Sequence, residues 1–164
     1  MLIQKIFHVH QGLEATKARL AHVQSYRQYL DGVRKAVITE DGVAQFDCVI
    51  PDGGFRAHMV LVELPTQDEN QVLFRSTAGN VEVSGLLEFF PIKDNLTEVQ
   101  LTLEYSLRSP VASIFNVFTA SLERFMNRQL RRMQAILNGE YLPFPVSTSP
   151  VRSSSATGSF ELAH

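Results

Sequence analysis

The feature that most constrains the fold is a long amphipathic helix predicted near the C-terminus, over residues 109–139. Ser109 can cap its first turn, Pro110 suits a first position whose N–H needs no partner, and Gly139 can turn left-handed beyond its end. At about 100° per residue, one broad face collects the apolar side chains of Val111, Phe115, Phe118, Leu122, Phe125, Met126, Met133, Ile136 and Leu137. A helix of this length spans roughly 40 Å. Something wide and concave must cover this face, and a curved sheet is the expected partner.

The opposite face of the predicted helix is polar and carries a row of arginines, namely Arg124, Arg128, Arg131 and Arg132. Two interpretations are open. In the first, the row complements the helix dipole and aids solubility. In the second, it docks an acidic partner or an anionic lipid surface. The sequence alone favours the first interpretation.

Length and composition limit the classes of protein. The chain has 164 residues, of which 45% are hydrophobic, enough for one domain with a substantial core. A net charge of −2 gives no argument for a nucleic-acid partner. The single cysteine, Cys48, excludes an internal disulfide and suits a reducing compartment. No apolar run has the length of a transmembrane segment, and the N-terminus lacks a signal-peptide core. We therefore expect a cytoplasmic protein.

Between the N-terminal region and the long helix, the pattern is that of β-strands. We expect strands at residues 2–10, 33–39, 43–50, 55–64, 71–78, 81–90 and 97–107, and two short helical segments within 13–30. In the last strand Val99, Leu101 and Leu103 alternate with polar residues, which predicts one buried and one solvated face. The connections are short, so neighbouring strands should pair as an antiparallel meander.

Two regions are expected. Residues 1–142 should form the domain, and residues 143–164 form a tail rich in Ser, Thr and Pro without amphipathic periodicity. We expect the fold class of the domain to be α+β.

This order of elements resembles the helix-grip architecture of the START/Bet v 1-like (SRPBCC) superfamily. It is most similar to the bacterial polyketide cyclase/dehydrase and lipid-transport families. The likeness runs from about Phe55 to Leu137 and includes a strand bounded by Pro65, an Arg75-Ser76 pair, a Gly-containing strand, the Thr97-x-Val99 strand and the long helix. Phe74 departs from the usual form, in which a Trp is common at this position. The resemblance implies a curved antiparallel sheet of about seven strands wrapped around the C-terminal helix.

The resemblance also implies a cavity between sheet and helix that holds a hydrophobic or amphipathic small molecule. Strand alternation and the helical wheel point to the same inner surfaces. The predicted ligand-binding residues are Phe46, Phe55, Met59, Phe74, Leu87, Phe89, Leu101, Leu103, Tyr105, Phe115, Phe118, Leu122, Phe125, Met126 and Gln129. The alternative is that these side chains simply fill a core.

Gln129 and Tyr105 are polar residues that the pattern places inside. A buried amide without a partner costs about 1–3 kcal/mol, so the Gln129 amide must be bonded to something. Its partners could be the sheet and the first helices, which is the favoured interpretation. They could also be the polar end of a ligand, with the Tyr105 hydroxyl as a second contact.

Three functions remain open at this stage. The first is a carrier or sensor of a lipid, quinone or polyketide-like compound. The second is a cyclase, aromatase or dehydratase, and the third is a module that binds a protein partner. Catalysis requires titratable side chains inside, and the pattern places no convincing Asp, Glu, Lys or His there, which favours the carrier. His8 and His10 share a strand face but lack a third ligand. We expect no metal, no cofactor and no catalytic residue.

Overall fold

The computed structural model describes residues 1–30, 33–38, 44–50, 55–108 and 112–141, with the backbone alone described for 23–24, 33–38, 44–50, 55 and 112–118. The elements in chain order are β1 (Leu2–Val9), α1 (Leu13–Leu20), the 3₁₀ helix η1 (Val23–Gln28), β2 (Val33–Ile38), β3 (Ala44–Ile50), β4 (Phe55–Leu64), β5 (Gln71–Gly79), β6 (Val81–Lys93), β7 (Leu96–Leu107) and α2 (Ala112–Leu137).

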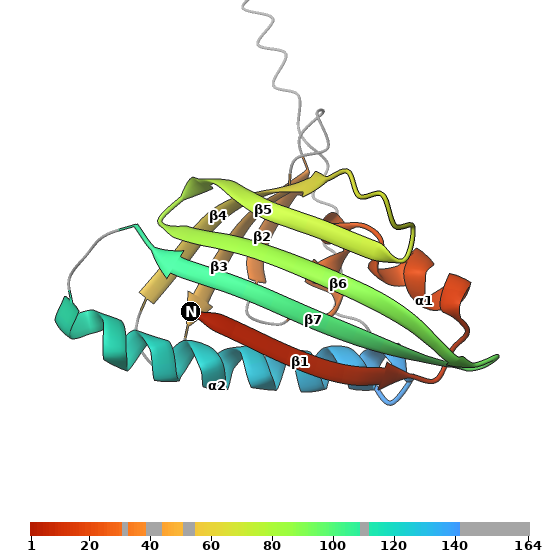
Figure 1. The fold of residues 1–164 in the computed structure, drawn as a ribbon. Coiled ribbons are helices and arrows are strands. Elements are labelled where there is room, and N and C mark those ends of the chain that lie inside the picture. Colours follow the sequence, from red (N-terminus) through yellow and green to blue (C-terminus); the bar gives the residue numbers. More distant parts are fainter. Residues whose placement is uncertain (31–32, 39–43, 51–54, 109–111, 142–164) are drawn as a thin grey trace, which may run out of the picture.

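The strands form one antiparallel seven-stranded sheet in the order β1-β7-β6-β5-β4-β3-β2. Each strand from β2 to β7 pairs with its neighbour in the chain, and β1 completes the sheet beside β7. Figure 1 shows α2 running along the sheet beside β1, with α1 near the end of that strand. The predicted fold class, an α+β helix-grip fold, is confirmed.

Irregular pairing lets the sheet curve. The register shifts between Val60 and Leu61 on β4 and between Pro91 and Lys93 on β6. Such bulges bend a strand and increase its twist. β6 runs to Lys93, whereas the sequence predicted its end at residue 90. Pro91 does not end the strand, because an irregular stretch near a strand end tolerates the missing N–H.

The alternation predicted for β7 is confirmed. Val99, Leu101, Leu103 and Tyr105 are buried, and the residues between them are exposed or half-buried. We call the sheet face that carries these four side chains the inner face. It packs in one hydrophobic cluster with α2, to which Phe125 belongs. Hydrophobic burial between the inner face and α2 is therefore what holds the two layers together.

The predicted helical region 13–30 splits as expected, but its second half is a 3₁₀ helix. In η1 the i→i+3 bonds from Ser25 N to His22 O and from Tyr29 N to Tyr26 O are both 3.0 Å long. Tyr26 and Tyr29 are buried. Short 3₁₀ segments serve as connectors, and this one places an aromatic ring at the inner face of the sheet.

The end of α2 has the geometry that the sequence predicted. Gly139 has a φ of 76°, which favours glycine. Its N–H donates to the Ile136 carbonyl at 3.1 Å, and the Glu140 N–H donates to the Ala135 carbonyl at 2.9 Å. This pair of bonds is a Schellman motif. The predicted helix start at Ser109 and Pro110 lies outside the described residues, as does the predicted tail.

Side chains from the N-terminal region bind the carboxyl end of α2. The Leu137 carbonyl accepts hydrogen bonds from Arg19 Nη1 at 2.9 Å and from Gln11 Nε2 at 3.2 Å. Asn138 Nδ2 donates to the His8 carbonyl on β1 at 3.2 Å. The first two bonds pair a carbonyl that the helix end leaves without a partner, and the third joins that end to β1. We refer to the Arg19 and Gln11 contacts as the Leu137 clamp. No helix in the described part of the chain is long and apolar enough to cross a membrane.

The Leu137 clamp should contribute measurably to stability. We predict that Arg19→Met lowers the free energy of unfolding by about 1–2 kcal/mol, because a charged donor to a helix C-terminal carbonyl is lost. Arg131→Met is the control, since Arg131 is exposed on α2, and it should change stability by less than about 0.5 kcal/mol. Urea unfolding followed by circular dichroism measures both. If Arg19→Met were as stable as the wild-type protein, the Arg19 part of the clamp would contribute nothing.

Candidate functional site

A cavity of about 150 Å³ lies between the inner face of the sheet and α2. Its walls are apolar and come from β1, the η1 region, strands β4 to β7, and α2. The lining residues are Phe7, Tyr26, Leu30, Ala57, Met59, Leu61, Phe74, Val81, Val83, Leu87, Leu101, Leu103, Tyr105, Leu122, Phe125, Met126, Gln129, Leu130 and Met133.

Many residues predicted to bind a ligand lie in these walls. They are Met59, Phe74, Leu87, Leu101, Leu103, Tyr105, Leu122, Phe125, Met126 and Gln129. Phe89 is buried in the core but does not line the cavity. It pairs with Val99, two positions along β6 from Leu87. The side chains of four further predicted residues, Phe46, Phe55, Phe115 and Phe118, lie outside the described residues. Ligand contact by any of these residues stays a prediction.

Sequence reasoning missed several lining residues. Phe7 and Ala57 could have been found, because alternation places each on the inner face of its strand. Met133 was assigned to the apolar face of the helix but not to the site. Tyr26 and Leu30 gave no signal, since a 3₁₀ turn and the residues after it have no amphipathic repeat.

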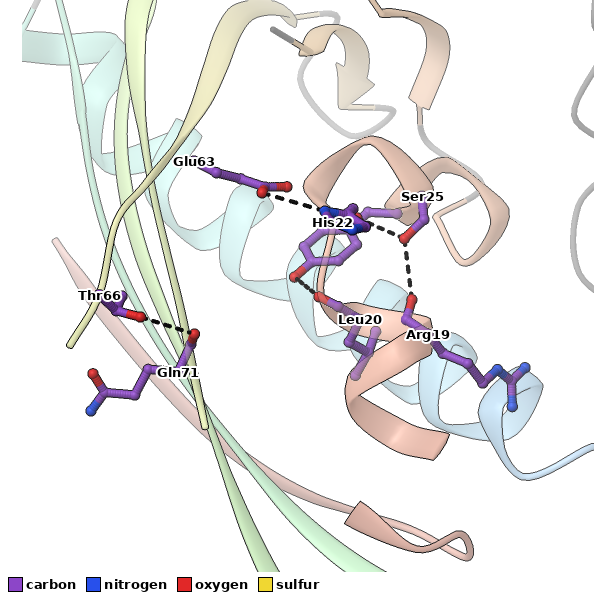
Figure 2. Close-up of polar contacts among 8 residues, drawn as sticks. Arg19, Leu20, His22, Ser25, Glu63, Thr66 and Gln71 are labelled. Atoms are coloured by element: carbon purple, nitrogen blue, oxygen red, sulfur yellow. Dashed lines mark hydrogen bonds and ion pairs between the residues drawn. The ribbon is translucent and has the colours of Figure 1, made fainter. Parts of the chain in front are cut away.

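The hydroxyl of Tyr26 is bonded within the protein. It donates to the Leu20 carbonyl at 2.8 Å (Figure 2). Burial raises the pKa of the Tyr26 hydroxyl, and the Glu63 carboxylate and the Tyr29 hydroxyl raise it further. Figure 2 also shows Glu63 on β4 facing His22 at the start of η1, with Oε2 and Nδ1 3.5 Å apart. Tyr26 therefore stays neutral and fixed at the cavity wall.

Tyr105 and Gln129 are the other polar lining residues in the described chain. The Tyr105 hydroxyl lies 3.3 Å from the Met1 sulfur, to which it can donate. Burial raises the pKa of the Tyr105 hydroxyl, and the negative charge of Glu123 raises it further. Gln129 is 1% exposed, and it has an interaction partner within the protein. This favours the structural interpretation of the amide.

The chemistry available inside is narrow. Among the described residues that line the cavity, the only titratable side chains are Tyr26 and Tyr105. Both have a raised pKa and keep their protons near neutral pH. A phenol in this state can donate a hydrogen bond but is a poor general base. These walls are suited to holding an apolar group and offer little for moving protons.

Gly85 shapes the cavity through Phe74. The two residues are partners across β5 and β6. A Cβ atom on Gly85 would lie 2.2 Å from Phe74 Cζ, so the ring occupies the space that any other residue would need. The Tyr26 ring meets Phe74 edge-on at a centroid distance of 6.3 Å. Gly85 therefore lets the Phe74 ring lie against the sheet and leaves space above it.

We predict that Gly85→Ala destabilises the protein by about 1–3 kcal/mol, because the added methyl group displaces the Phe74 ring. Phe74→Leu in the same chain should remove that clash. The two changes together should therefore destabilise less than the sum of the single changes. Urea unfolding of the four proteins measures this coupling. Additive effects would show that the Phe74 ring does not restrict Gly85.

The Gln129 amide gives a second prediction. Gln129→Leu should lower the free energy of unfolding by about 1–3 kcal/mol without ligand, because its partners are left unsatisfied. Asn127→Leu, on a half-buried position of the same helix, is the control and should have a smaller effect. Calorimetry of the apo proteins measures both. Unchanged or increased stability of Gln129→Leu would instead favour a role in binding a ligand.

Comparison with known proteins shows where else this architecture occurs. No protein-family model and no curated protein matches the sequence. Among solved structures, a Thermus thermophilus protein matches with a TM-score of 0.69 and 18% identity, over 85% of this chain and 99% of that one. A START superfamily protein from Mycobacterium smegmatis matches with a TM-score of 0.63 and 16% identity, over 85% and 95% of the two chains.

An aromatase/cyclase from a Streptomyces species matches with a TM-score of 0.68 and 16% identity, over 85% of this chain and 92% of that one. At such identities the likeness establishes shape and leaves chemistry open. The resemblance predicted from the sequence is thus confirmed at the level of the fold: this chain has the helix-grip fold found in a START superfamily protein and in an aromatase/cyclase.

Proposed function

We propose that this protein is a carrier or sensor that binds a small hydrophobic molecule in the cavity between the sheet and α2. The observation that carries the proposal is an apolar cavity whose polar lining side chains already have partners within the protein. Tyr26 and Tyr105 make hydrogen bonds to other residues, and Gln129 is not without a partner.

The size of the cavity narrows the class of ligand. Apolar cavities of about 150 Å³ stay dry and accept molecules of about the size of benzene. Pockets for drug-sized ligands measure about 300–1,000 Å³. The present cavity, at about 150 Å³, suits a compact hydrocarbon group such as an aromatic ring or the end of an acyl chain. A fused polyketide of several rings would require the walls to move apart.

The polarity of the walls narrows the class further. A polar group that enters an apolar site gives up its hydrogen bonds to water and needs replacements there. Among the described lining residues, the hydroxyls of Tyr26 and Tyr105 already donate elsewhere. The cavity therefore favours neutral, apolar groups over charged or strongly polar ones.

A cyclase or aromatase is the second candidate, because two solved structures with the same fold are described as aromatase/cyclases. An enzyme of that kind would have to move protons within its cavity. The described walls supply phenols that hold their protons, and no carboxylate, imidazole or amine. This composition favours binding over catalysis.

A reducing compartment such as the cytoplasm suits the single cysteine, Cys48.

Toluene is a suitable probe of the proposed site. At ten times its Kd it should raise the melting temperature of the wild-type protein by about 3–6 °C. Ala57→Leu should abolish this shift, since Ala57 is 4% exposed and lines the cavity, so that a larger side chain would fill it. Ala120→Leu, on an exposed position of α2, is the matched control.

Calorimetric scans with and without toluene measure the effect, and native mass spectrometry of gently purified protein can reveal a retained molecule. A wild-type protein that toluene does not stabilise would contradict the proposal. So would an equal shift in a folded Ala57→Leu variant.

A further inference from the structure

The outer face of α2 carries the row of arginines that the sequence revealed, and we propose that it docks the protein on an anionic phospholipid surface. The arginine stripe consists of Arg124, Arg128, Arg131 and Arg132. All four residues are exposed. The proposal concerns the outside of the helix and does not depend on the contents of the cavity.

The geometry of α2 concentrates positive charge in the stripe. Its four members lie within eight residues along the helix, a distance of about 12 Å, and no acidic residue lies between them. The Arg128 guanidinium stacks over the Phe125 ring, 5.8 Å from its centroid. Arg124 Nη2 donates to Ser121 Oγ at 3.4 Å. The stripe is therefore a continuous cationic surface about two turns long.

Dipole complementation does not explain the stripe, although the sequence favoured it together with a role in solubility. The last turn of α2 holds no basic residue, and the stripe ends at Arg132, more than a turn before Leu137. The dipole effect falls off within that last turn. In addition, Arg124 and Arg128, like Arg128 and Arg132, are like-charged pairs at i and i+4, which weaken a helix. The helix dipole therefore does not account for this arrangement.

Acidic side chains of β6 and β7 lie on the side of the sheet opposite α2. The chain as a whole has a net charge of −2. Glu88 on β6 and Glu98 and Glu104 on β7 alternate with buried residues, so they point away from the inner face of the sheet. The stripe points away from the sheet on the other side, because Phe125 and Gln129 of the same helix face the cavity. The outer face of the sheet also carries Arg56 and Arg75, whereas the stripe has no acidic residue among its arginines, so α2 is the face that an anionic surface attracts.

A lipid surface fits the stripe better than an acidic protein does. Protein interfaces depend on buried apolar or aromatic anchors. Between residues 119 and 137, the described part of α2 has no exposed large hydrophobic side chain. Adsorption to an anionic bilayer needs only charge, and each arginine contributes about fivefold in affinity. Guanidinium groups also bind phosphate oxygens in pairs.

The test is vesicle flotation of the apo protein at low salt. We expect binding to vesicles of phosphatidylglycerol and phosphatidylcholine and none to pure phosphatidylcholine. Binding should be lost at about 0.5 M salt, because the Debye length there is on the order of a few ångströms and the charges are screened. Arg128→Gln with Arg131→Gln should lower the affinity about 25-fold. Arg128→Glu with Arg131→Glu should lower it further. These positions avoid Arg124 and Arg132, which have further contacts.

The matched control is Arg56→Glu with Arg75→Glu, which makes the same change in net charge at exposed positions on β4 and β5. It should lower the affinity by less than about fivefold. Circular dichroism establishes that each variant is folded. The proposal would be overturned if the wild-type protein did not bind these vesicles. It would also be overturned if the control lost as much affinity as the Arg128→Glu, Arg131→Glu variant, or if the folded glutamine variant bound as tightly as the wild-type protein. Capture of an acidic protein through the same arginines, without vesicle binding, would do so as well.

Discussion

Burial of the apolar face of α2 against the inner face of the sheet is the interaction on which the rest of the structure depends. This burial is uneven along the helix. Near the carboxyl end, Ile136 and Leu137 are 2% and 0% exposed. Toward the middle, Leu122 and Met126 pack on the core but are only partly buried, and both line the cavity. Tight packing at one end thus fixes the helix, while looser packing further along leaves space for a ligand.

Much of the fold could be predicted because its signals are local. The buried and exposed faces of β7 follow from alternation along one strand. The end of α2 at Gly139 follows from the few residues around that glycine. The residues that line the cavity were harder to predict. Alternation shows which face of a strand a side chain is on, but not whether that part of the strand borders the cavity. Phe89 therefore faces inward as predicted yet lies beyond the cavity. Tyr26 reaches the wall from a 3₁₀ turn, whose placement depends on tertiary contacts that no short pattern reveals.

The shared fold explains less about function than the cavity walls do. Proteins described as START superfamily members and as aromatase/cyclases have this same shape. What distinguishes one helix-grip protein from another is the small set of side chains that face the enclosed space. Here that set includes Phe74 and Tyr26, whose rings meet edge-on, and a glycine that makes room for the first of them. Small changes at such positions would alter the volume without altering the architecture.

The Leu137 clamp has a consequence for how the protein is made. Arg19 and Leu137 are separated by 118 positions in the chain. Contacts of such high sequence separation require closure of a very long loop and form late and slowly in folding. During synthesis the whole meander emerges before α2, so the apolar inner face of the sheet stays uncovered until α2 has left the ribosome. The cavity is thus the last part of the domain to come into existence, and the nascent chain is most prone to aggregate just before it closes.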